Sequence, residues 1–254
     1  MIQNYLATQK KRCWEIYSNY YDNKHYRNHE EQYLDEIRDQ LTAESILLDA
    51  GCGADMPFTK LVANRAKLAV GTDIGDLGTD RGTAVAVRAD LNHLPFKEGT
   101  FDLITSMSVM EHLRDPELAI RELSRVLKPG AVAIFQTPNK YDYVSIVARI
   151  TPTWFHKRVL LQLLGRQEED TFPTYFNANS KNRINSLLRQ SNLLPLKVVL
   201  FNQYPAYLMF SSLFFRLGIL YERVTSRFDI FAQLRAWILV VAKKNNSEIG
   251  KPLF

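Results

Sequence analysis

The sequence has little cysteine and no block of charges of one sign. Its 254 residues include only two cysteines, Cys13 and Cys52, and no close pair of Cys or His residues has the spacing of a structural zinc site. We therefore expect reduced thiols and no bound metal. The formal net charge is +5, but the lysines and arginines are scattered along the chain. This distribution gives no support for a nucleic-acid partner, and we expect none.

The sequence also has no uninterrupted apolar run long enough to cross a membrane. Residues 1–27 are polar and rich in tyrosine, unlike a secretory signal. The longest apolar stretch, 204–220, is interrupted by Pro205 and Arg216 and is short for a span that needs about 20 residues. We expect a cytoplasmic protein. For 204–220, a buried cap, a homodimer contact and a peripheral membrane contact all stay open.

Apolar segments of strand length recur along the chain and alternate with helical patterns. The length suits one α/β core, and 46% hydrophobic residues is ordinary for a globular protein. The expected strands cover 45–50, 67–71, 83–89, 101–109, 131–136, 196–201 and 237–242. Such alternation predicts a Rossmann-like, doubly wound, mostly parallel sheet of seven strands with helices on both faces. Two aromatic-rich insertions, 140–179 and 202–229, are expected to form a cap over the carboxyl end of the sheet.

The helix after the fourth strand has clear boundary signals. Asp115 is expected as its N-cap, followed by Pro116 at the first helical position. Its apolar stripe continues to Leu127, and we expect the helix to stop at 128–130, which is Lys-Pro-Gly. A second helix is expected after Ser180, as its cap.

Three predicted strands end in residues suited to an adenosyl group. The first strand runs into Gly51 and Gly53, and glycine permits a sharp turn and the close approach of a ligand. Asp73, at the end of the second strand, has two carboxylate oxygens that can accept from the two ribose hydroxyls. Asp90, at the end of the third, can accept from the adenine amine, with Leu91 beside it. These strand ends predict one adenosine site.

The natural competitor is a dinucleotide cofactor, whose fingerprint would place a third glycine at position 56. That residue is Met56. Asp49 and Asp55 would also set negative charge beside a diphosphate, whereas they suit the ammonium and sulfonium of a cationic cofactor. The electrostatics therefore favour S-adenosylmethionine over NAD.

Six motifs occur in order at βα spacing. They are Asp49-Ala50-Gly51-Cys52-Gly53, Gly71-Thr72-Asp73-Ile74, Ala89-Asp90-Leu91, Phe101-Asp102-Leu103-Ile104, Met110-Glu111-His112-Leu113 and Arg125-Val126-Leu127-Lys128-Pro129-Gly130. In this order the chain resembles class I S-adenosylmethionine-dependent methyltransferases, in particular the branch with small-molecule and quinone-pathway enzymes. The resemblance is strong over 44–139. It departs at Asp55, where many members have a third glycine.

The resemblance implies a methyltransferase domain over 44–245, whose last strand is antiparallel, after an N-terminal helical segment or lid at 1–43 and before a tail at 246–254. The cofactor-binding residues that we predict are Asp49, Ala50, Gly51, Cys52, Gly53, Asp73, Ile74, Asp90, Leu91 and Ser106. The tyrosines at 17, 20, 21 and 26 either close over the cofactor or simply pack.

The expected reaction is methyl transfer to a small-molecule, glycan or lipid-like acceptor at oxygen. For a hydroxyl acceptor, His112 is the candidate base, although it equally fits a role in ordering its loop; Glu111, His156 and Asp170 are lesser candidates. The segment 106–109 lacks the Asn/Asp-Pro-Pro-aromatic sequence of DNA amino-methyltransferases, which disfavours base methylation. A non-catalytic cofactor-binding scaffold subunit and, more remotely, an NAD-dependent oxidoreductase remain as alternatives.

Overall fold

The computed structural model describes residues 2–21, 26–150 and 172–246. His156 and Asp170, two lesser candidates for the base, lie outside these residues. The contacts divide the chain into two compact units: Met1–Gln32, Asn139–Pro173 and Leu200–Trp237 form unit 1, and Tyr33–Pro138, Thr174–Val199 and Ile238–Phe254 form unit 2.

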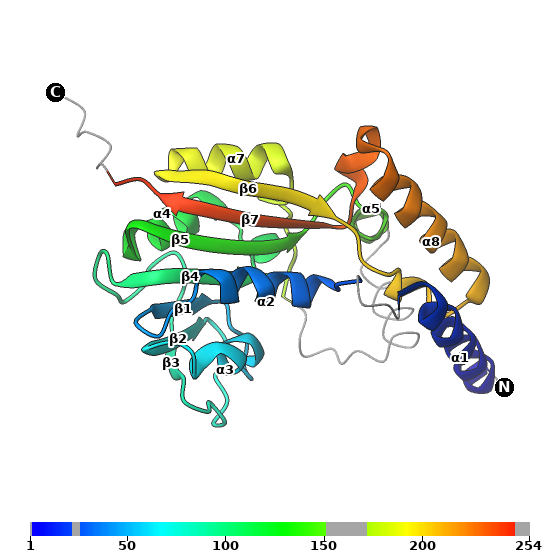
Figure 1. Cartoon of the computed structure of the whole chain (residues 1–254), viewed down its shortest axis with the longest axis horizontal. Helices are drawn as coiled ribbons and strands as arrows, with labels where there is room; N and C mark the ends of the chain where they lie inside the picture. The colour runs from blue at the N-terminus through cyan, green and yellow to red at the C-terminus, as the bar shows by residue number, and fades with distance from the viewer. Residues whose placement is uncertain (1, 22–25, 151–171, 247–254) are drawn as a thin grey trace. The chain divides into compact units, whose positions relative to one another are not determined.

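Unit 2 is built on a seven-stranded sheet with the order β3-β2-β1-β4-β5-β7-β6 (Figure 1). Its strands are β1 Ile46–Ala50, β2 Leu68–Asp73, β3 Val85–Arg88, β4 Phe101–Met107, β5 Leu127–Pro138, β6 Leu193–Phe201 and β7 Trp237–Lys244. The pairs among β1 to β5 are parallel, and Figure 1 shows the β7 arrow opposed to that of β6. The doubly wound, mostly parallel sheet that the alternation predicted is confirmed.

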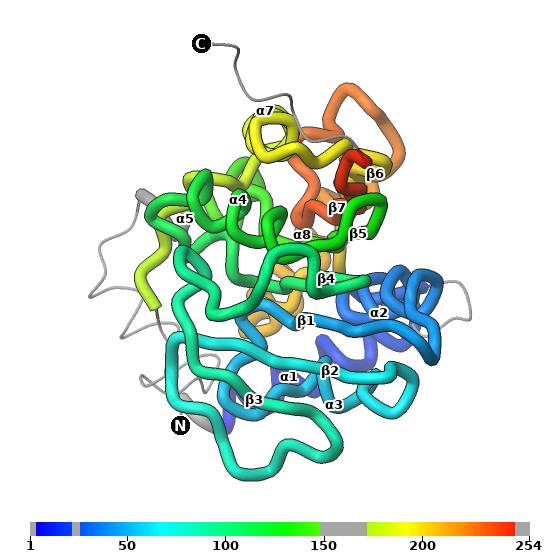
Figure 2. Tube along the Cα trace, turned by 90° about the vertical axis from the view of Figure 1, so that its left-hand side faces the viewer, coloured from blue at the N-terminus to red at the C-terminus, as the bar shows by residue number. Residues whose placement is uncertain are grey.

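Helices cover both faces of this sheet. Helices α4 (Pro116–Val126) and α7 (Lys181–Gln190) lie on one face, and α2 (His29–Gln40) and α3 (Pro57–Ala63) lie on the other (Figure 2). They bury apolar stripes against strands whose side chains are almost wholly enclosed, as expected for a parallel sheet. The central strands β1 and β4 carry four of these side chains, each at most 1% exposed: Leu47, Leu48, Leu103 and Ile104.

The boundaries of several elements differ from those expected. Helix α4 begins as predicted, since the Asp115 carboxylate accepts from the Leu118 amide at 3.2 Å. It ends at Val126, however, and β5 already begins at Leu127 rather than at 131. Gly130, with φ +76°, allows the strand to pass through the Lys-Pro-Gly segment. Ser180 occupies the N-cap of α7, but its side chain makes no capping hydrogen bond.

Other strand limits also move. β4 ends at Met107 instead of 109, because Ser108 adopts a left-handed backbone with φ +57°. β3 is shorter than the expected 83–89, and β6 begins three residues before the expected start at 196. The parallel register places Asp49 between Gly71 of β2 and Thr105 of β4, which fixes the neighbours of the first acid of the glycine turn.

The regular structure of unit 1 is mainly helical among the described residues. It contains α1 (Ile2–Tyr21), α5 (Tyr143–Ile150), α8 (Ser212–Arg227) and the 3₁₀ turns η3 (Ala206–Leu208) and η4 (Asp229–Leu234). Helices α1 and α8 pack together around a core of Cys13, Ile16, Tyr21, Met209, Phe215 and Ile219. Tyr17, Tyr26 and Tyr204 pack against this core. Among the described residues, no helix is long and apolar enough to span a bilayer.

Candidate functional site

The turn after β1 is held by backbone hydrogen bonds to the neighbouring strand. The amides of Gly51 and Cys52 both donate to the Thr72 carbonyl, at 2.7 and 3.0 Å. Gly51 and Gly53 adopt left-handed conformations, with φ of +77° and +69°. A Cβ at Gly51 would lie 2.2 Å from Cγ2 of Val109, whereas one at Gly53 would meet nothing within 4 Å. Gly51 is therefore required by packing, and Gly53 leaves open space for a ligand.

Met56 occupies the position of the third glycine in a dinucleotide fingerprint. Its backbone is left-handed, with φ +50°, and its side chain is fully buried. The methionine fits because Gly71 of β2 lies beneath it: a Cβ at Gly71 would approach Cε of Met56 to 2.4 Å and Sγ of Cys52 to 2.9 Å. The close packing of helix and strand that a loop glycine would provide is supplied here by a strand glycine.

Asp73 ends β2 beside this turn. Its Oδ2 accepts from the Gly53 amide and its Oδ1 from the Gly75 amide, both at 2.9 Å. Each carboxylate oxygen has a second lone-pair direction, so the group can still accept from a pair of hydroxyls. The next side chain, Ile74, is apolar yet 57% exposed. An acid beside an exposed apolar side chain is chemically suited to a ribose and the base attached to it.

Asp90 follows β3 and is exposed. Its Oδ1 accepts from the amide and the side-chain nitrogen of Asn92, at 2.9 and 3.0 Å. Leu91, the next residue, is buried. Asp90 is thus oriented by its own loop, and its exposed carboxylate stays accessible to a donor such as an exocyclic amine.

Asp49 is enclosed, only 4% exposed. Thr59 donates to its Oδ2 at 2.5 Å and Thr105 to its Oδ1 at 3.1 Å. Burial raises the pKa of Asp49 to about 6, and the Asp73 charge acts in the same direction, against the two threonine hydrogen bonds. The motif identified Asp49 but not its donors, because Thr105 is recognised only when β4 is known to lie next to β1.

Replacing Asp49 with Asn is expected to remove one component of the pH dependence of folding. The pKa of about 6 in the folded protein lies above the ordinary aspartate pKa of 3.8, so the folded state binds the proton more tightly. This residue's contribution therefore favours folding at low pH and is lost as pH rises from about 4 to about 6, by roughly 3 kcal/mol at most.

The readout is the slope of unfolding free energy against pH, from urea titrations of the parent and of Asp49→Asn. The parent should lose more stability than the variant over that range, and the exposed Asp39→Asn variant should behave like the parent. Equal slopes in the parent and in Asp49→Asn would contradict the raised pKa.

Two other residues that we predicted to contact the cofactor, Ser106 and Cys52, have their side chains enclosed in the fold. The Ser106 hydroxyl donates to the Ala50 carbonyl at 2.7 Å, and both residues are fully buried, so this bond ties β4 to β1. Burial, together with the charges of Asp49 and Asp73, raises the pKa of Cys52 to about 12, which keeps its thiol protonated and unreactive. Their roles in cofactor contact stay predictions.

His112 lies in the turn η1 (Met110–His112) after β4. Its Nε2 is 4.0 Å from Oε1 of the neighbouring Glu111, which is only 5% exposed. Thr137 donates to the other carboxylate oxygen of Glu111 at 2.9 Å, and Asn179 donates to the Thr137 hydroxyl at 2.6 Å. Burial raises the pKa of Glu111. A buried polar chain thus holds a carboxyl beside the candidate base; sequence reasoning missed Thr137 and Asn179, which are distant in the chain.

Comparison with known proteins agrees with this geometry. A family model described as a methyltransferase domain matches residues 24–193. A protein of Mycolicibacterium smegmatis named "Probable S-adenosylmethionine-dependent methyltransferase" is 31% identical over 146 residues, which cover 52% of this chain and 56% of that one. A ubiquinone biosynthesis O-methyltransferase of Hahella chejuensis is 34% identical over 104 residues, 37% and 43% of the two chains. The chain spans about half the length of the curated relatives it matches.

A solved structure shares the fold. The geranyl diphosphate C-methyltransferase of Streptomyces coelicolor, in complex with Mg²⁺, geranyl diphosphate and S-adenosyl-L-homocysteine, superposes with a TM-score of 0.53 at 16% identity, over 85% of this chain and 79% of that one. At this identity the likeness concerns the fold alone. The family match covers most of the chain, including the glycine turn and the strands that end in Asp73 and Asp90. The chain therefore belongs to the methyltransferase-domain family, which confirms the resemblance to class I S-adenosylmethionine-dependent methyltransferases.

Proposed function

We propose that this chain transfers a methyl group from S-adenosylmethionine to a hydroxyl of a small-molecule, glycan or lipid-like acceptor. The observation that carries the proposal is the glycine turn after β1, open at Gly53, with the Asp73 carboxylate beside it. Two relatives are named as a methyltransferase dependent on this cofactor and as an O-methyltransferase of ubiquinone biosynthesis. These names support the cofactor and an oxygen acceptor.

The residues of the turn fit this cofactor. Asp73 would hold the ribose hydroxyls, Ile74 and Leu91 would contact the adenine, and Asp90 would accept from its amine. Asp49 and Asp73 concentrate negative charge at the ends of β1 and β2, which suits a cationic ligand and opposes a diphosphate. When bound, S-adenosylmethionine supplies a methyl group on a positively charged sulfur. The sulfur leaves as a neutral thioether, so the methyl group is readily transferred.

The protein's remaining tasks are to orient the acceptor and to take its proton. Orientation can contribute roughly 7–11 kcal/mol in favourable cases. His112 is the candidate base, since it follows β4, which lies beside β1 in the sheet, and is partly exposed. Glu111 lies beside the imidazole, with Oε1 4.0 Å from Nε2 of His112.

Calorimetry with S-adenosylmethionine, S-adenosylhomocysteine and NAD tests the cofactor, and transfer of labelled methyl groups to fractionated cell extracts tests the reaction. We expect the first two ligands to bind and NAD not to bind. Binding of NAD alone would favour the oxidoreductase. Binding of the adenosyl ligands without transfer to any fraction would favour a scaffold subunit.

With an acceptor in hand, His112→Ala should lower kcat by about 10²- to 10⁴-fold if this residue removes the proton. The affinity for S-adenosylmethionine should be unchanged, because none of the proposed cofactor contacts involves the imidazole. The exposed His93→Ala variant is the matched control and should retain the parent rate. Equal turnover by His112→Ala and the parent would assign His112 to loop structure instead.

A further inference from the structure

Helix α8 of unit 1 has an exposed apolar stripe opposite its buried face. Its buried side chains Phe215 and Ile219 belong to the core that it shares with α1. Along the other face, four apolar side chains are between 36% and 65% exposed: Leu213, Leu217, Leu220 and Val224. At 3.6 residues per turn these four fall within an arc of about 60°. A run of this kind is unusual on a soluble surface and marks an interaction site.

More exposed apolar side chains follow the end of the helix. Phe228 is 53% exposed, and in η4 Ile230 is 85% and Phe231 40% exposed. The segment 204–220 is thus divided between two environments: Met209, Phe215 and Ile219 are buried, whereas its exposed leucines belong to a surface that extends toward Phe231. We call the exposed apolar side chains from Leu213 to Phe231 the α8 surface.

One edge of the α8 surface is basic. Arg216, Arg223 and Arg227 are exposed and fall within an arc of about 40° directly beside the leucine stripe. Arg223 lies over the Tyr20 ring, 4.4 Å from its centroid. The one acid of α8, Glu222, is turned inward and accepts a hydrogen bond from the Tyr21 hydroxyl. The exposed face of the helix therefore combines apolar and positive side chains, and the exposed acid that follows the helix, Asp229, pairs with Arg235.

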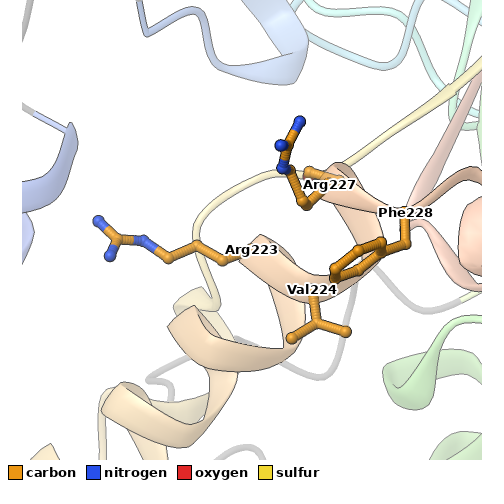
Figure 3. Close-up of a pocket in the computed structure, with 5 residues that line it drawn as sticks. Arg223, Val224, Arg227 and Phe228 are labelled. Atoms are coloured by element: carbon orange, nitrogen blue, oxygen red, sulfur yellow. The ribbon is translucent and has the colours of Figure 1, made fainter.

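The apolar and basic parts meet in a shallow hollow at the end of α8. This hollow, of about 560 Å³, is lined by Arg223, Val224, Ser226, Arg227 and Phe228. Figure 3 shows the Val224 and Phe228 side chains close to one another, with the two guanidinium groups extending away from them. Apolar and positive side chains thus lie next to one another at this end of α8.

We propose that the α8 surface docks on a membrane that contains anionic phospholipid. The leucines and Phe228 would enter the boundary between headgroups and acyl chains, and the arginines would contact lipid phosphates. A second copy of the chain fits less well, because a symmetric contact through this stripe would bring the arginines of two helices together, and the exposed acid that follows them, Asp229, already pairs with Arg235. The proposal does not depend on the proposed methyl transfer.

Co-sedimentation of the full chain with vesicles tests the docking. We expect binding to vesicles of phosphatidylglycerol and of an equimolar mixture with phosphatidylcholine, little binding to phosphatidylcholine alone, and release by added salt. Arg216→Gln with Arg227→Gln should weaken binding to the mixed vesicles roughly 10- to 30-fold. Leu217→Ser with Leu220→Ser should weaken it by about tenfold or more.

The matched control is Arg183→Gln with Arg189→Gln, which removes the same charge from the exposed side of α7 and should bind as the parent does. Equal loss in this control, or equal binding to phosphatidylcholine alone, would overturn the proposal. If the chain does not bind vesicles but forms a dimer in sedimentation equilibrium, and the leucine substitutions dissociate that dimer, the α8 surface would be assigned to a second copy. A marked fall in Tm of the leucine variant would show that the chain itself covers the stripe, and would overturn it too.

Discussion

The Asp73→Ala variant is expected to bind S-adenosylmethionine and S-adenosylhomocysteine roughly 10- to 100-fold more weakly than the parent. A hydrogen bond to a charged group is worth more than one between neutral groups, and a ribose would lose an acceptor for both hydroxyls. The carboxylate also fixes the loop by accepting from Gly53 and Gly75. Both effects act in the same direction.

Asp73→Asn separates these effects, because the amide keeps one acceptor oxygen but carries no charge. Its affinity should lie between those of the parent and the alanine variant. The matched control is Asp76→Ala, which removes an exposed acid of the same loop that pairs with Arg88. Calorimetry measures the affinity of all four proteins for S-adenosylmethionine, and thermal melting shows which of them are folded. A folded Asp73→Ala with parental affinity would refute the ribose assignment.

Alanine at the two glycines of the turn is expected to affect mainly stability at Gly51 and mainly binding at Gly53. In Gly51→Ala the new Cβ would collide with Val109, and the left-handed backbone adds strain. We expect the unfolding free energy to fall by about 3–5 kcal/mol. In Gly53→Ala only the backbone strain remains, about 1–2 kcal/mol. Binding, however, should fall by more than about tenfold, because the methyl group enters the space left for the ligand.

Urea unfolding and calorimetry together test this contrast. Adding Val109→Ala to Gly51→Ala should recover the part of the stability lost to the collision and leave the backbone strain. The prediction fails if Gly53→Ala binds S-adenosylmethionine as the parent does, or if Gly51→Ala is no less stable than Gly53→Ala.

Features with a local cause were predictable from the sequence. The sheet class followed from alternation, the start of α4 from Asp115 and Pro116, and the glycine turn from two glycines directly after an apolar strand. The acids that follow β2 and β3 were identified for the same reason, since a strand end in a parallel sheet faces the ligand edge. Each of these signals lies within a few residues of the element that it marks.

Features with a non-local cause were not predictable. The hydrogen bond from Thr105 to Asp49 depends on β4 lying beside β1, and the bonds from Asn179 to Thr137 and from Thr137 to Glu111 join segments that are far apart in the sequence. The early start of β5 reflects pairing with β4, which overrides the Lys-Pro-Gly stop signal. The exposed side of α8 was hidden for a related reason, because its buried and exposed apolar residues look alike until the packing against α1 is known.

The Met56 side chain, from the loop before α3, fills the space beside Gly71 in β2 that a larger strand residue would need. A larger residue in the strand would require a smaller one in the loop, so we expect tolerated substitutions at the two positions to occur as compensating pairs. Consequently, a search pattern that demands three glycines in the loop overlooks chains in which the missing one has moved to the adjacent strand.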